Sequence, residues 1–138
     1  MRYNNYHKHD HVSNIFTPDT NTKQEEYILK ALEYGHTSYY STNHGSFGDI
    51  FEARTLCNKY GLRCIAGIEG YIVPNASQKD KRNYHIIVIP KTDEARKKMN
   101  YVSSMANIKG FYYKPRFFLS DLLKLDPNDV YITTACVA

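Results

Sequence analysis

Strand-like and helix-like segments alternate along the whole of this 138-residue chain. The expected strands cover 2–7, 37–42, 62–73, 84–90 and 130–138, and the expected helices cover 23–34, 49–60 and a stretch after Thr92. This alternation predicts parallel strands joined by right-handed crossovers, in an open doubly wound sheet or a barrel. A barrel is favoured, because no GxGxxG or GxxxxGK[ST] follows any strand.

The ends of the expected helices carry local signals. Glu25 and Glu26 place negative charge in the first turn of the first helix, and Gly35 follows its end. Gly61 ends the second helix in the same way, and Thr92 can cap the third. The inward faces are expected to carry Ile50, Ala53, Cys57, Met99, Val102 and Ala106. A short helix near 120–125 follows a loop, GFYYKPR.

Size and composition favour one domain over residues 1–138, the front part of a larger barrel, since the strand–helix units are too few to close one. No leader or membrane-length apolar run is evident, and the three cysteines form no CxxC, so we expect a cytoplasmic protein without a membrane partner. The net charge of +4, with basic clusters at 79–82 and at Lys114 and Arg116, permits a phosphate-rich partner.

Three of the six histidines lie in the short stretch YHKHDH. His7, His9 and His11 occupy alternate positions, and side chains two apart in an extended segment project from the same face. Three imidazoles on one face are a way to build a metal site. His11 is ambiguous, because a third ligand, a phosphate donor and a surface ring are all compatible with its position. His36, directly after a helix end, is better explained as a cation facing the helix dipole.

Chemically versatile residues gather where the expected strands end, the edge that carries ligands and catalytic groups in α/β folds. They are His7, His9, Asn43, His44, Glu69 and Cys136. His85 is an exception near the start of its strand. Taken singly, a strand histidine is more often a satisfied core group, and a single cysteine a small buried apolar residue. Their convergence nevertheless favours a metal cluster.

Several segments resemble the N-terminal PHP (polymerase and histidinol phosphatase) domain of bacterial DNA polymerase III alpha subunits, most nearly the variants carried by phages. They are HKH, STNHGSFGDIFEA, GLRCIAGIEGYIV, NYHIIVIPKT, GFYYKPRF and DVYITTACVA, and the similarity runs from Tyr6 to Ala138. The resemblance implies a distorted (βα)7 TIM-like barrel that holds two or three divalent metal ions.

Carried over by position, the resemblance implies a ligand set of His7, His9, Asp19, His44, Glu69, His85 and Cys136. Among these, His7 and His9 hold one ion, Glu69 bridges, and all three are expected to be catalytic. Zinc is the first choice because of the cysteine, with manganese or iron as alternatives. Two departures are evident: Asn43 stands where family members commonly have an acid, and the closing Asp-x-His motif is not found up to Ala138.

The implied function is metal-dependent phosphodiester hydrolysis, as a 3′–5′ exonuclease that proofreads DNA for a replicative polymerase, in contact with the polymerase core or other replisome subunits. His11, Asn43, Lys114 and Arg116 are expected on the substrate side. A solvated basic turn explains Lys114 and Arg116 equally well. Two other functions remain open: an inactive scaffold that supports the polymerase or docks a partner subunit, and a small-molecule phosphatase.

Overall fold

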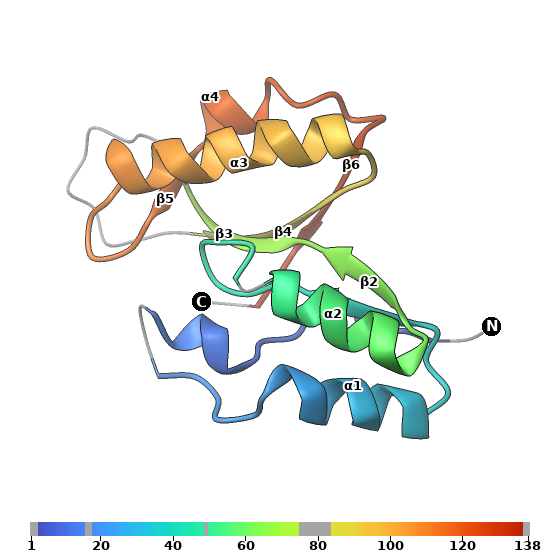
Figure 1. Cartoon of the computed structure of the whole chain (residues 1–138). Helices are drawn as coiled ribbons and strands as arrows, with labels where there is room; N and C mark the ends of the chain where they lie inside the picture. Colours follow the sequence, from blue (N-terminus) through green and yellow to red (C-terminus); the bar gives the residue numbers. More distant parts are fainter. Residues whose placement is uncertain (1–2, 16–17, 49, 75–83, 137–138) are drawn as a thin grey trace. The chain divides into compact units, whose positions relative to one another are not determined.

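The structure, a computed structural model, describes residues 3–15, 18–48, 50–74 and 84–136. The chain divides into two compact units, Met1–Gly67 and Ile68–Ala138, and Figure 1 labels the helices α1 to α4 and most of the strands. Three predicted features lie outside the described residues: the helix start at Asp49, the basic cluster at 79–82 and the last two residues of the chain.

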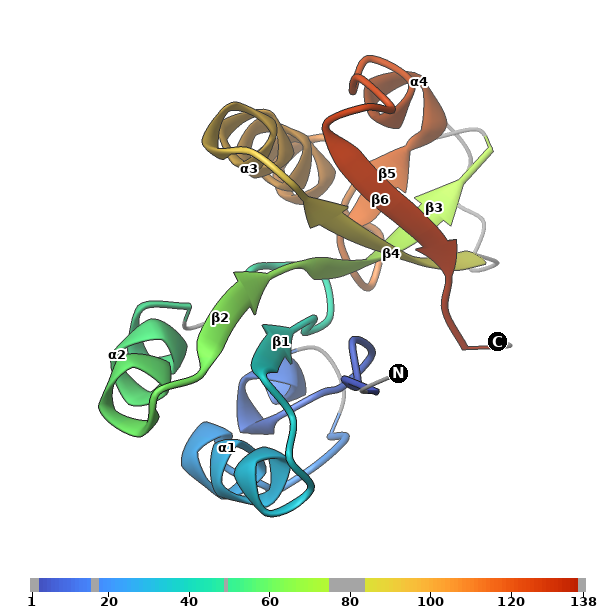
Figure 2. The same ribbon diagram turned by 90° about the vertical axis from the view of Figure 1, so that its right-hand side faces the viewer.

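The first unit contains the parallel arrangement that the sequence predicts. Its elements are η1 (His11–Ile15), α1 (Gln24–Glu33), β1 (Ser38–Ser41), α2 (Ile50–Tyr60) and β2 (Arg63–Ala66). The two strands pair in parallel, in register from Ser38 opposite Arg63 to Ser41 opposite Ala66. Helices α1 and α2 pack against each other, and both contact β1 (Figure 2). This strand–helix–strand unit therefore confirms the predicted parallel pairing of strands joined through a helix.

The core of the first unit lies between these helices and strands. Ile28 of α1, Tyr39 of β1 and Ala53 of α2 are at most 2% exposed. Both helices are followed by a glycine with positive φ, Gly35 at 69° and Gly61 at 73°, a conformation that costs glycine little. The local signals therefore placed these two helices correctly.

The second unit is a mixed sheet with two helices. Its elements are β3 (Ile68–Val73), β4 (Tyr84–Pro90), α3 (Asp93–Ile108), β5 (Arg116–Phe118), α4 (Leu119–Leu122) and β6 (Val130–Thr134). The strand order is β5-β3-β4-β6 (Figure 2). Strand β4 runs antiparallel to both β3 and β6, whereas β3 and β5 are parallel. Helix α3 begins as predicted, since the Thr92 side chain accepts a hydrogen bond from the Ala95 N–H.

Two predictions about strands in this region are wrong. The run 62–73 is not one strand but two, β2 and β3, which belong to different sheets. Gly67 lies between them, and its N–H donates to the Ser41 carbonyl at the end of β1. The strand 84–90 is antiparallel to its neighbours, although a continuous apolar run suggested a parallel sheet. The structure is therefore a mixed α/β fold in which a (βα)7 barrel is not confirmed.

Two further segments differ from prediction. The N-terminal stretch forms no strand over its described residues 3–10, because side chains bind its backbone: the Lys8 N–H donates to the Thr42 hydroxyl and the Asp10 N–H to the Asn43 side-chain oxygen. The end of the predicted loop GFYYKPR enters the short strand β5 at Arg116. Among the described helices, none combines the length and apolar character needed to span a bilayer.

Candidate functional site

The segment from His7 to Asp10 presents two different faces. His7 and His9 are partly exposed, whereas Lys8 is 8% exposed and Asp10 is fully buried. The Nε2 atoms of the two imidazoles lie 3.3 Å apart. The alternation matches an extended backbone, in which successive side chains point to opposite sides. His11 begins η1 with an exposed side chain, so the alternation that would align it with the other two ends before it.

A buried polar network lies on the other face of this segment. The Asp10 carboxylate accepts hydrogen bonds from Lys8 Nζ at 3.2 Å, the Tyr39 hydroxyl at 3.1 Å, the Val12 N–H at 3.1 Å and Asn43 Nδ2 at 3.0 Å. Burial alone would raise the pKa of Asp10, but the charge of Lys8 and these hydrogen bonds hold it below its ordinary value. Burial lowers the pKa of Lys8 in spite of its acidic partner.

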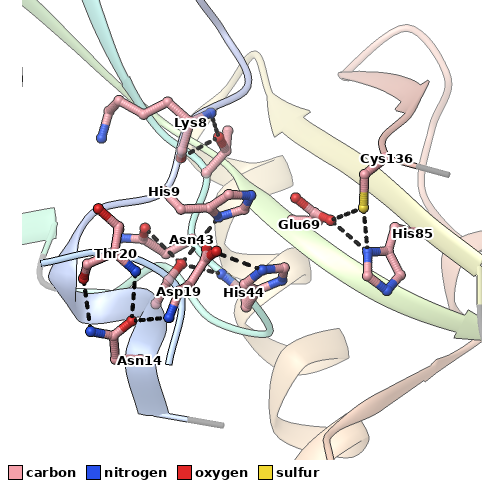
Figure 3. A network of polar contacts seen from close by, with 12 residues as sticks. Lys8, His9, Asn14, Asp19, Thr20, Asn43, His44, Glu69, His85 and Cys136 are labelled. Carbon is pink, nitrogen blue, oxygen red and sulfur yellow. Dashed lines mark hydrogen bonds and ion pairs between the residues drawn. The ribbon is translucent and has the colours of Figure 1, made fainter. Parts of the chain in front are cut away.

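His44 and Asp19 join the imidazole face of the first unit (Figure 3). The rings of His44 and His9 stack with centroids 4.2 Å apart, and His44 Nε2 lies 3.6 Å from Asp19 Oδ2. Asn14 positions the acid, because its Oδ1 accepts the N–H groups of Asp19 and Thr20 at 2.8 and 3.1 Å. One ligand atom from each of His9, Asp19 and His44 lies within 4.8 Å of the others.

The Asn43 side chain is buried and connects Asp10 with Ser13 through hydrogen bonds. Its Oδ1 accepts from the Asp10 N–H and from the Ser13 hydroxyl, each at 3.0 Å. Gly48 packs close by with φ 59°, and a Cβ there would lie 2.8 Å from Asn43 Nδ2. The predicted contact between Asn43 and substrate therefore finds no support in its burial.

The second unit gathers three more of the predicted ligands. His85 Nδ1 lies 2.8 Å from Glu69 Oε1 and 2.9 Å from Cys136 Sγ, and the sulfur lies 3.5 Å from the same carboxylate oxygen (Figure 3). Glu69 is fully buried. Burial and the charge of Glu69 raise the pKa of the Cys136 thiol. A nitrogen, an oxygen and a sulfur donor atom therefore lie close together in this unit.

The antiparallel direction of β4 explains the exceptional position of His85. Glu69 pairs with Ile87 and Tyr71 with His85, so Glu69 and His85 are diagonal neighbours on one face. The first residues of β4 therefore lie beside the later part of β3, where a parallel strand would have put its end. Strand β6 ends at Thr134, so Cys136 lies two residues beyond it and not within a strand as the prediction for 130–138 had it, although the Ala135 N–H still donates to the His85 carbonyl at 3.1 Å.

The two predicted basic contacts have different surroundings. Lys114 is partly buried with Nζ 4.1 Å from the Tyr71 ring centroid; burial lowers its pKa, and the charges of Cys136 and Glu69 oppose that change. Arg116 is 4% exposed, and its Nε donates to the Gly110 carbonyl at 2.8 Å. Lys114 is therefore suited to a ligand near Glu69, whereas Arg116 is part of the internal structure.

Both sets of side chains fit divalent metals chemically. Tetrahedral nitrogen ligands at about 2.0–2.1 Å from zinc lie roughly 3.4 Å apart, close to the observed spacing of 3.3 Å between His7 and His9 Nε2. Imidazole, carboxylate and thiol donors suit zinc, manganese or iron. The first unit supplies His7, His9, Asp19 and His44, and the second supplies Glu69, His85 and Cys136. Each set can thus contribute to metal binding.

Sequence reasoning missed the residues that position these ligands. They are Lys8, Asp10, Ser13 and Asn14. Lys8 and Asp10 had a readable signal, because the alternation that aligns His7 with His9 places the two charged residues on the opposite face. Ser13 and Asn14 had no such signal, because neither belongs to an alternating pattern. Ser13 contacts Asn43 and His44 far along the chain, and Asn14 contacts the nearby Asp19 and Thr20.

The sequence model of the PHP domain family matches residues 6–138. Curated relatives are DNA polymerase III subunits alpha: that of Aquifex aeolicus is 29% identical over 83% of this chain, and that of Helicobacter pylori 28% over 99%. The subunit of Treponema pallidum is 29% identical over 96% of the chain. The match covers only 11–12% of the length of these relatives.

Proposed function

Because the chain belongs to the PHP domain family, we propose that it is the N-terminal region of a DNA polymerase III alpha-like protein and a metal-dependent phosphoesterase. The proposed substrate is the phosphodiester at a DNA 3′ end, and the proposed role is 3′–5′ proofreading. The observation that carries this proposal is the approach of the ligand atoms of His9, Asp19 and His44 to within 4.8 Å.

Each unit contributes ligands in this proposal. His7, His9, Asp19 and His44 bind metal in the first unit, and Glu69, His85 and Cys136 in the second. Bound divalent ions lower the pKa of a coordinated water and stabilise charge that develops on a phosphoryl group. Lys114 adds a cation near Glu69 that can contact a phosphate, a salt-sensitive interaction. Zinc remains the first choice of metal.

The surroundings of Asn43 favour an active domain over an inactive scaffold. The acid expected at this position is missing, but the Asp10 carboxylate lies 3.0 Å from the Asn43 amide nitrogen. A negative charge is therefore present one side chain away, although Lys8 compensates it. With asparagine at this position, both polar atoms of the side chain are hydrogen-bonded to Asp10, so the buried network of the first unit is intact.

The test combines metal analysis with hydrolysis by the full 138-residue chain. Protein stripped with chelator is loaded with zinc, manganese or iron, and the bound metal is counted by mass spectrometry. Release of nucleotide from a 3′-labelled oligonucleotide is then measured with and without EDTA. We expect His9→Ala and Cys136→Ala each to lose bound metal and to reduce release by more than the roughly 10- to 100-fold typical of lost outer-shell partners.

His36→Ala is the matched control, because His36 is an imidazole of the first unit whose ring contacts are with Tyr3 and Tyr34. It should retain both metal and activity. Stoichiometric metal without nucleotide release, but with hydrolysis of a small phosphomonoester, would point to the small-molecule phosphatase. A folded wild-type chain that binds no metal would leave the scaffold role and refute the proposal.

A further inference from the structure

Ser13 stands at the centre of the first unit's polar contacts. Its side chain is fully buried, and its hydroxyl contacts three groups: Asn43 Oδ1 at 3.0 Å, the backbone N–H of His44 at 3.1 Å and the ring atom Nδ1 of His9 at 3.1 Å. A hydroxyl has one proton to donate and two lone pairs that accept. Three neighbours therefore use its whole capacity, and the direction of each hydrogen bond can be assigned.

The orientation of the Asn43 amide fixes the first direction. Asp10 makes two contacts with it: its N–H donates to Asn43 Oδ1, and its carboxylate accepts from Asn43 Nδ2, each at 3.0 Å. A flipped amide would set N–H against N–H and oxygen against oxygen, so only one orientation is compatible. The oxygen of Asn43 thus faces Ser13, and an oxygen at 3.0 Å requires the hydroxyl proton between them.

The remaining two contacts follow from that assignment. With its proton directed at Asn43, the Ser13 oxygen can only accept, and the backbone N–H of His44 occupies one lone pair. The other lone pair faces His9 Nδ1, which must then carry the proton. The opposite arrangement, with the hydroxyl donating to His9, would leave the oxygens of Ser13 and Asn43 facing each other without a proton.

We infer that Ser13 is a positioning residue that holds the neutral His9 ring as its Nδ1–H tautomer, so that Nε2 carries the lone pair. This inference rests on the proposed function, because Nε2 is the atom that would bind metal beside His7 Nε2 at 3.3 Å. A hydrogen bond at the second ring nitrogen is the usual way in which proteins fix the tautomer and orientation of a metal-binding histidine. Here Ser13 makes that hydrogen bond, and its own orientation is set by Asn43, which is in turn held by Asp10.

The test reads the tautomer directly in metal-free protein. The full chain, labelled with nitrogen-15 and stripped with chelator, is studied by long-range proton–nitrogen NMR at alkaline pH, where an ordinary imidazole is neutral. We expect the His9 signals of the Nδ1–H form in the wild-type chain. In Ser13→Ala the signals should shift towards the Nε2–H form, and Ser13→Thr, which retains a hydroxyl, should restore them.

The second measurement is zinc affinity, by competition with a chelating dye. We expect Ser13→Ala to weaken binding by about 10- to 100-fold, the usual effect of removing an outer-shell partner. Ser104→Ala is the control, because that hydroxyl donates to the Asn100 carbonyl on an exposed part of α3. It should leave both the tautomer and the affinity unchanged.

The wild-type spectrum decides the inference even where Ser13→Ala does not fold. Nε2–H signals for His9 in wild-type protein would overturn it, as would Nδ1–H signals that persist in a folded Ser13→Ala variant. Nδ1–H signals in a folded wild-type chain that binds none of zinc, manganese and iron would uphold the assignment and refute the proposed function, so the two failures are distinguishable.

Discussion

Replacement of Lys8 by methionine tests whether the buried ion pair with Asp10 supports the segment that carries His7 and His9. The ammonium lies 3.2 Å from the carboxylate, and the two side chains are 7% and 0% exposed. Lys8→Met keeps most of the buried stem and leaves the Asp10 charge without its cation. Breaking a buried pair in this way typically costs about 3–5 kcal/mol.

Protonation of Asp10 sets an upper limit to that cost. At pH 7 a carboxyl group with an ordinary pKa near 3.9 can be neutralised for about 4 kcal/mol, and at pH 5 for about 1.5 kcal/mol. In the wild-type chain the pKa of Asp10 is lowered, so its contribution is complete above the ordinary pKa and declines only as pH falls through the lowered value. The loss caused by Lys8→Met should therefore be about 3–4 kcal/mol at pH 7 and about 1.5 kcal/mol at pH 5.

The assay is urea unfolding of the full chain, followed by circular dichroism at both pH values. Lys30→Met is the matched control: Lys30 also contacts a carboxylate, that of Glu33 at 2.8 Å, but these side chains are 52% and 61% exposed. It should cost less than about 0.5 kcal/mol at either pH. The double variant Lys8→Met/Asp10→Asn should recover most of the loss. A loss below about 1 kcal/mol at pH 7, or the same loss at both pH values, would refute the reasoning.

Two further predictions use the same unfolding assay. Gly48→Ala should cost about 1–3 kcal/mol more than Gly35→Ala, because both glycines have positive φ but only the first would bring a Cβ against Asn43; equal losses would mean that Asn43 yields without cost. Thr92→Ala should cost about 1 kcal/mol, since the Ala95 N–H loses its cap, and an unchanged midpoint would show that water replaces it.

The helices were predictable from sequence because their signals are local. Acids in the first turn, a following glycine and a threonine cap placed α1, α2 and α3 at or near their observed bounds. These signals act through backbone groups of the same helix, so no knowledge of other segments is needed. The buried Met99, Val102 and Ala106 follow from helical periodicity in the same way.

Strand direction was not predictable, because a buried strand has the same apolar composition in either direction. The run from Tyr84 to Pro90 was recognised as a strand, but its partners are antiparallel. That error made His85 look misplaced, although the diagonal contact with Glu69 follows directly once the direction is known. Strand β5 was missed for a related reason: three residues carry too little periodicity to stand out from a loop.

The alternation in YHKHDH links the chemistry of the first unit to its stability. A period of two gives His7 and His9 one face and Lys8 and Asp10 the other, so each residue from His7 to Asp10 belongs either to the imidazole pair or to the buried network. The buried face is bound to the Asn43 amide, which contacts Ser13, and Ser13 contacts His9. A substitution of Asp10 is therefore linked to the His9 ring through three hydrogen bonds. Lys8 and Asp10, two charged residues of a type usually found at the surface, are thus connected to the candidate site.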